Sequence, residues 1–335
     1  MVASRRNIFA AVALFFVAPL VAEYLLGDFP ITMLSPLIMM APLYGGGAIL
    51  IRELTRRSGR GWPTMLLLGA AYALIEEGFT TQSLFNPHYL NLPFHLLAPA
   101  WIPALGIGGW WTLFMLNVHT FWSMGVSIAL VEAAIPSRAR TPWLGKIGLA
   151  IAALLFLLGA AVGTAYTIHH EHFMASHAQF AVTAIFVVLF ICAAFLIPFP
   201  RIHDRAGLVP SPWLTGTGTF LLGMLIMKMP PIFNWAAVVA MLVIDGVFLV
   251  AAGVLSRRAQ WTPLHTLSIA AGGAIAYGVN AFFQPPVIGK VSHAVALTGH
   301  IVFLAAAIAL IALAAIRTHA CLAPEKSAVT EPASQ

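Results

Sequence analysis

The chain has 335 residues, of which 60% are hydrophobic and only 8% are charged. Soluble globular proteins carry about 25% charged residues and about 45–50% apolar ones, so this composition excludes a soluble enzyme, a disordered chain and a nucleic-acid-binding domain. The net charge of +6 comes from lysines and arginines that are dispersed between apolar segments, which indicates membrane topology rather than a nucleic-acid partner. The two cysteines, Cys192 and Cys321, cannot form a disulfide framework.

The hydropathy pattern predicts an all-α, polytopic integral membrane bundle of about ten transmembrane helices. A membrane helix needs about 20 mostly apolar residues, and proline and glycine mark most of the joins between such segments. The first segment follows Arg5 and Arg6 and is longer than a signal-peptide core, so we expect it to remain as an uncleaved anchor. The expected spans lie near 7–26, 31–51, 62–84, 108–135, 145–168, 178–200, 212–229, 234–255, 265–283 and 291–316.

The distribution of basic residues predicts the orientation. If the N-terminus is cytoplasmic, 15 of the 17 lysines and arginines fall on the inner side, and only Lys228 and Lys290 fall outside. Positive charges concentrate in cytoplasmic loops, so we expect both termini inside, the lipid bilayer as the surroundings, and a bacterial cytoplasmic (inner) membrane as the location. Residues 1–317 then form a single transmembrane domain, and the polar tail 318–335 is expected to be disordered.

Two adjacent acids interrupt the third predicted span. A charged side chain near the centre of a membrane helix costs about 2.5–3.5 kcal/mol, so Glu76 and Glu77 require a reason. Neighbouring positions on an α-helix point about 100° apart, so we expect one carboxylate to face a cavity and the other a different partner. Close carboxylates suit general acid/base chemistry or proton carriage, whereas a polar pair capping the outer helix end is the structural alternative.

The fourth predicted span carries Asn117 and His119 at a depth compatible with that pair. Antiparallel neighbours joined by one loop often pack together, so His119 is expected beside Glu76 and Glu77. A carboxylate and an imidazole at one level form a minimal acid/base or metal pair. The structural alternative is a buried histidine that is simply hydrogen-bonded.

Three further polar residues lie in later spans and mark a candidate substrate or ion pathway together with Asn117. Asp245 sits at the centre of the eighth span and must be paired, protonated or solvated. Asn280 and His300 lie in the ninth and tenth spans, where either could instead bridge two helices.

The outer loops are rich in histidine. His169, His170, His172 and His177 fall within nine residues around one glutamate, a composition that can bind Zn²⁺ or Cu²⁺. A divalent metal such as zinc is therefore a candidate cofactor here, and a polar loop that happens to use histidine is the alternative.

The segments LIEEGFTTQ (74–82) and FMLNVHTFW (114–122) together resemble the core of the CAAX-protease and bacteriocin-processing family of intramembrane proteases, whose motifs are EExxxR, FxxxH and HxxxN. The resemblance covers about two of the ten helices, and its motifs are incomplete. Thr81, Met115 and Ala276 stand where that family has Arg, Phe and His. The resemblance implies that Glu76 or Glu77 activates water, that His119 assists, and that Asn280 closes the site.

Two other functions stay open on the sequence. Ten spans divide into two sets of five, and an odd number per half makes the halves inverted, as in many secondary transporters. In that case Glu76, Glu77 and Asp245 would couple transport to protons or a cation. In the third case the chain is a non-catalytic membrane subunit whose protein partner supplies the chemistry. The sequence indicates no substrate for any of these three candidate functions.

Overall fold

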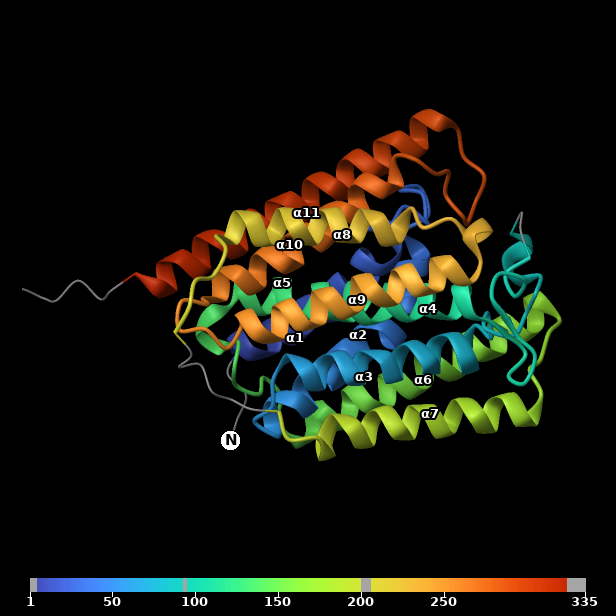
Figure 1. Cartoon of the computed structure of the whole chain (residues 1–335), viewed down its shortest axis with the longest axis horizontal. Helices are drawn as coiled ribbons and strands as arrows, with labels where there is room; N and C mark the ends of the chain where they lie inside the picture. Colours follow the sequence, from blue (N-terminus) through green and yellow to red (C-terminus); the bar gives the residue numbers. More distant parts are fainter. Residues whose placement is uncertain (1–4, 93–94, 200–205, 324–335) are drawn as a thin grey trace, which may run out of the picture.

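The computed structural model describes residues 5–92, 95–199 and 206–323, which form an elongated bundle of roughly aligned helices (Figure 1). Several rods change from α-helical to π-helical geometry along their length. In chain order the described part holds ten helical rods: α1 (Arg5–Pro19) continuing into η1 (Leu20–Leu25), α2 (Ser35–Arg57), α3 (Trp62–Ile75) continuing into η2 (Glu76–Thr80), α4 (Gly109–Asn117) continuing through η4 (Val118–Val126) into α5 (Ser127–Ala134), α6 (Lys146–Glu171), α7 (His177–Leu196), α8 (Pro212–Met227), α9 (Trp235–Leu255), α10 (Pro263–Ala281) and α11 (His293–Leu322).

Short elements complete the described fold. Three 3₁₀ turns, η3 (Tyr89–Asn91), η5 (Pro136–Arg138) and η6 (Pro231–Phe233), lie in connecting segments. Strands β1 (Trp101–Ile102) and β2 (Ile107–Gly108) pair antiparallel between the third and fourth rods.

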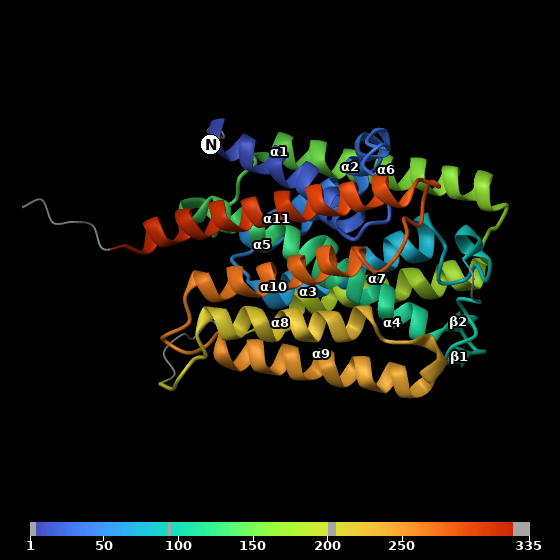
Figure 2. The ribbon, with the colours of Figure 1, turned by 90° about the horizontal axis from the view of Figure 1, so that it is seen from above.

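Seven of the described helical stretches are long and apolar enough to cross a membrane by length and composition. They confirm an all-α, multi-pass membrane bundle. The rods that fall outside this group are α3 with η2, α8 and α10. The start of α1 and the end of α11 lie at the same end of the bundle, as Figure 1 and Figure 2 both show.

The rods differ in how much of their surface is buried. In the rod Gly109–Ala134, 72% of the most apolar window is buried, against 11% in α6 and in α9. The exposed residues of the outer rods are mostly large and apolar, such as Ile147 and Val250. Such surfaces suit contact with lipid, so the central rods form the protein core and the outer rods face the bilayer.

Glycines let the first rods approach closely. A Cβ on Gly45 of α2 would lie 2.2 Å from the carbonyl oxygen of Phe15 in α1, and a Cβ on Gly159 of α6 would lie 2.5 Å from the backbone nitrogen of Leu43. Small residues at helix contacts in membranes allow backbones to pack in this way. The interior of the bundle around the first, second and fifth rods therefore depends on these two glycines.

Replacing Gly45 by alanine is expected to destabilise the protein by about 1–3 kcal/mol, because the added methyl group forces α1 away from α2. The measurement is the thermal unfolding midpoint of the purified protein in detergent. The control is Gly246→Ala on α9, where a Cβ would meet nothing within 4 Å. An equal midpoint for both variants would contradict the close-packing account.

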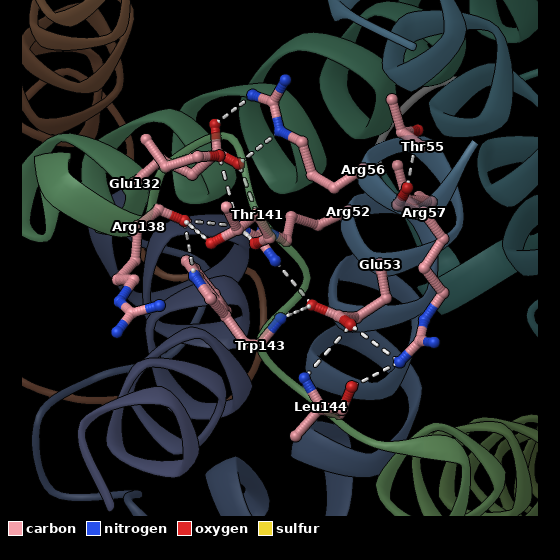
Figure 3. Close-up of polar contacts among 12 residues, drawn as sticks. Arg52, Glu53, Thr55, Arg56, Arg57, Glu132, Arg138, Thr141, Trp143 and Leu144 are labelled. Atoms are coloured by element: carbon pink, nitrogen blue, oxygen red, sulfur yellow. Dashed lines mark hydrogen bonds and ion pairs between the residues drawn. The ribbon is translucent and has the colours of Figure 1, made fainter. Parts of the chain in front are cut away.

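A buried ionic network, drawn in Figure 3, joins α2 and α5 to the loop that follows α5. Arg52 has no exposed side-chain surface; it contacts Glu53 at 2.6 Å and Glu132 at 3.1 Å. Arg56 binds both oxygens of Glu132, at 2.8 and 2.5 Å. Arg52 also donates to three carbonyl oxygens of the loop and lies 3.6 Å from the ring centroid of Trp143. A charge this deep is tolerated only when paired and fully hydrogen-bonded, as it is here.

The C-terminal end of α11 extends further than the sequence predicts. The helix runs to Leu322, so the first residues of the expected disordered segment 318–335 are helical. Arg317 donates to the carbonyl oxygen of Ala134 at 3.0 Å, and Thr318 donates to that of Ala133 at 3.1 Å. These contacts dock the helix end on α5, which composition alone does not reveal. The tail residues 324–335 lie outside the described residues.

Candidate active site

Three π-helical segments meet at the candidate site. Glu23 lies in η1, Glu76 and Glu77 lie in η2, and His119 lies in η4. A π-helical turn inserts an extra residue into an α-helix and is frequently found at functional sites. In three rods, therefore, the π-helical segment is the part that carries the acidic or imidazole side chain of the candidate site.

His119 bridges the two acids of η2. Its Nε2 lies 2.7 Å from Oε1 of Glu77, and its Nδ1 lies 3.1 Å from Oε2 of Glu76. All three residues are at most 3% exposed. A neutral imidazole offers one donor and one acceptor, so an imidazole held between two carboxylates carries a second proton, or one carboxyl group is protonated.

The arrangement of the two acids corrects the expectation that they face different partners. Both contact the same ring because its two nitrogens lie on different edges and each acid takes one. The π-helical turn also changes the angular spacing of adjacent side chains, since its hydrogen bonds run from i to i+5. A prediction that assumes α-helical geometry therefore does not place both acids against one imidazole.

Glu77 is held in place by further donors. Its Oε2 accepts hydrogen bonds from the hydroxyl groups of Thr81, at 3.1 Å, and Ser83. The indole of Trp111 in turn donates to Ser83 at 3.0 Å. With the imidazole on Oε1, both oxygens of Glu77 are occupied, which fixes the position of the carboxylate.

Glu76 is bonded less completely. Its Oε2 is buried and accepts no hydrogen bond of normal geometry among the described residues, although it faces the imidazole of His119. The hydroxyl groups of Tyr44 and Tyr72 lie beside it. The two phenol rings lie 6.1 and 6.2 Å from the imidazole and form one wall of the site. Glu76 is therefore the acid with spare capacity to bind a water molecule or a substrate.

Glu23 was not predicted from the sequence as part of the site. The hydroxyl of Tyr44 on α2 donates to the carboxylate of Glu23, and the charge of Glu23 acts on His119. A depth comparison could have found it, because Glu23 follows Asn7 by 16 residues and Glu77 follows Trp62 by 15. Ser83, Tyr44 and Tyr72 were also missed, and hydroxyl residues of this kind carry no distinctive sequence pattern.

The other predicted pathway residues make no hydrogen bond or ion pair with this cluster among the described residues. Asn117 donates to Asp245 at 3.1 Å, so the acid of α9 pairs with the amide of α4. Asn280 is buried on α10 and its Oδ1 has no hydrogen-bond partner in the described part of the chain. His300 is buried on α11 against Phe282, with ring centroids 5.6 Å apart.

The outer histidines are exposed, and they are not gathered around a common point. His169 and His170 are edge-on to each other at 5.3 Å, and His170 packs on Tyr166. The neighbouring Glu171 instead accepts from Asn86 at 3.3 Å and from the backbone of Leu90 at 3.1 Å. Within the described residues, the group able to offer three metal ligands is the buried one, Glu76, Glu77 and His119, whose donor atoms lie within 4.8 Å of one another.

The charge of the site is unbalanced. Glu23, Glu76 and Glu77 supply three carboxylates and His119 supplies one imidazole. No lysine or arginine forms an ion pair with them among the described residues, since the arginine pairs all belong to the network on α2. Buried carboxylates without a counter-charge retain protons or attract a cation, which is the condition for acid/base work.

A family model described as an uncharacterized membrane protein family matches residues 12–324. The chain therefore belongs to that family, and its multi-pass membrane character agrees with the bundle described above. No curated protein and no solved structure matches the chain.

Proposed function

We propose that this member of the uncharacterized membrane protein family is an intramembrane hydrolase of peptide bonds. The observation that carries the proposal is the buried contact of His119 with both Glu76 and Glu77. The resemblance of the two segments to the CAAX-protease and bacteriocin-processing family supports it, because the matched residues are the ones that meet. The differences at Thr81, Met115 and Ala276 make the chain a distant relative of that family at most.

In this proposal Glu76 is the general base. Its Oε2, which faces His119 but accepts no hydrogen bond of normal geometry among the described residues, removes a proton from a water molecule, and the resulting hydroxide attacks the carbonyl carbon of the scissile bond. The imidazolium of His119 donates to the oxyanion through Nδ1, while Glu77 holds Nε2 and stabilises the positive charge. The tetrahedral intermediate then collapses, and the carboxyl group of Glu76 returns its proton to the leaving amine. Asn280, buried on α10, is the group that the resemblance adds to the site.

A divalent metal is a second way for the same residues to act. One imidazole and two carboxylates within 4.8 Å fit the three protein ligands of a catalytic zinc site. A bound zinc would supply an activated water at neutral pH. Metal analysis of the purified protein and a chelator titration of the cleavage activity distinguish the two forms, because the metal-free mechanism predicts full activity after chelation.

Secondary transport is the weaker alternative. It needs Asp245 to act with Glu76 and Glu77, yet the carboxylate of Asp245 accepts a hydrogen bond from Asn117, the last residue of α4. We therefore expect Asp245→Asn to leave peptide cleavage within about twofold of the wild type, because an amide can keep the contact with Asn117. A loss of cleavage as large as that caused by Glu76→Gln would contradict the separation of the two sites.

The proposal also includes the number of membrane crossings and the side on which the termini lie. Ten crossings with both termini cytoplasmic, in a bacterial inner membrane, agree with the two ends of the chain lying at one end of the bundle. Residues 1–317 then act as one transmembrane domain. Cysteine labelling of single-cysteine variants from each side of a vesicle tests this, and labelling of the two termini from opposite sides would contradict it.

The experiment for the function uses the purified protein in lipid vesicles with a mixed library of quenched fluorescent peptides. The proposal predicts cleavage of some members by the wild type and none by Glu76→Gln. If the wild type cleaves no peptide faster than that variant, hydrolysis is wrong, and a non-catalytic subunit becomes the better interpretation.

A further inference from the structure

The loop between α5 and α6 carries basic side chains that neither the buried network nor the proposed mechanism uses. The segment PSRARTPWLGK (136–146) contains Arg138, Arg140 and Lys146 and no acidic residue. All three are exposed, and none of them forms an ion pair in the described part of the chain. Figure 3 shows the carbonyl group of Arg138 bonded within the network, whereas its guanidinium carries no contact. We call these three residues the loop patch.

The backbone beneath the loop patch is held in one conformation. The buried Arg52 donates to three carbonyl oxygens of the segment, at 2.7 to 3.2 Å. Glu53 accepts hydrogen bonds from the backbone nitrogens of Trp143 and Leu144, at 2.8 and 3.2 Å. A loop that is already ordered loses little conformational entropy when it binds a ligand, so the loop patch is prepared for an anion.

The surroundings of the loop patch add positive charge to it. The network beneath it pairs three arginines with only two glutamates. Arg317 of α11 adds a further cation at the edge of the loop, where it donates to the carbonyl oxygen of Ala134 at 3.0 Å. This end of the bundle therefore has an excess of positive charge, which attracts anionic partners.

An apolar surface begins directly beside the loop patch. Lys146 is the first residue of α6, and Ile147, Ile151 and Leu154 follow it as exposed side chains. Their spacing of four and three residues places them on one face of the helix. A cationic loop that adjoins an apolar helix face matches a molecule with an anionic head and a hydrocarbon chain. A free anion or a nucleic acid would leave the apolar face without a role.

We propose that the loop patch and this face of α6 bind an anionic phospholipid. Arg138, Arg140 and Lys146 bind the phosphate of the headgroup, because guanidinium and ammonium groups donate several charge-assisted hydrogen bonds to phosphate oxygens. The exposed face of α6 lies along an acyl chain. Under the proposed topology the lipid belongs to the cytoplasmic leaflet, where basic residues next to a membrane helix attract anionic headgroups.

The test is native mass spectrometry of the purified protein in detergent with equal amounts of phosphatidylglycerol and phosphatidylcholine of the same chain length. The readout is the ratio of protein ions that carry one phosphatidylglycerol to those that carry one phosphatidylcholine. We expect the wild type to prefer phosphatidylglycerol. The triple variant Arg138→Gln, Arg140→Gln, Lys146→Gln is expected to lower that preference at least about tenfold. An unchanged preference would overturn the proposal.

The matched control removes the same number of charges elsewhere, as Lys228→Gln, Arg257→Gln, Lys290→Gln. This variant is expected to keep the wild-type preference, and an equal loss in both triple variants would show a general effect of net charge and overturn the assignment. The thermal midpoint without added lipid shows whether the loop variant is folded. If it is not, Arg140→Gln alone is expected to lower the preference at least about threefold, and no change in it would count against the proposal.

A soluble competitor distinguishes a lipid site from a site for free anions. Glycerol 3-phosphate carries the phosphate without acyl chains, so a large excess of it is expected to leave phosphatidylglycerol bound. Displacement of the lipid by this competitor would overturn the lipid assignment. None of these measurements requires peptide cleavage, so the lipid site can stand or fail independently of the proposed hydrolase.

Discussion

Glu76→Gln is expected to lower the rate of peptide cleavage by about 10²- to 10⁴-fold, the usual contribution of a positioned general base. The glutamine is nearly the same size and can still lie beside His119, but it cannot accept a proton from water. The measurement is the initial rate of cleavage of a responsive library peptide by the protein in vesicles, at a fixed peptide concentration.

A second variant, Ser83→Ala, provides the comparison for this result. Ser83→Ala removes one of the three donors to Glu77, so a smaller loss is expected, because Thr81 and His119 still hold the carboxylate. A Glu76→Gln protein that melts like the wild type and cleaves at the wild-type rate would exclude Glu76 as the base.

Arg52→Met is expected to destabilise the protein by about 3–5 kcal/mol, the cost of breaking a buried ion pair by removing one partner. The methionine fills a similar volume, yet Glu53 loses its closest cation and three carbonyl oxygens of the loop after α5 lose the hydrogen bond from Arg52. Glu132 keeps Arg56, so the loss is centred on Glu53 and the loop. Chemical denaturation in detergent, followed by tryptophan fluorescence, gives the change in the free energy of unfolding.

The matched control for this prediction is Arg140→Met in the same loop. Arg140 is exposed, and a substitution there is expected to change the free energy of unfolding by less than about 0.5 kcal/mol. Similar values for the two variants would show that the network in Figure 3 adds little to stability.

The sequence predicted the membrane bundle because long apolar segments have few alternatives to helices in a bilayer. It also placed Glu76, Glu77 and His119 together, since buried charge is costly and the two helices are joined by one loop. These inferences need only composition, spacing and depth.

The sequence could not supply the π-helical segments or the partners drawn from distant helices. Glu53 pairs with its neighbour Arg52, but Arg56 binds Glu132, which lies 76 positions away in the chain. In the same way Asp245 joined Asn117 instead of the acid cluster, because which faces of α9 and α4 meet depends on the packing of every rod between them. Glu23 was overlooked because a lone acid near a helix end has an interfacial explanation that costs nothing.

Peptide cleavage in water enriched in ¹⁸O tests the central claim most directly. The account predicts that mass spectrometry finds one ¹⁸O atom in the new carboxyl group formed by the wild type, and that Glu76→Gln forms no such product. Cleavage products without label, or labelled products formed equally by Glu76→Gln, would contradict the assignment of Glu76, Glu77 and His119 as a hydrolytic site.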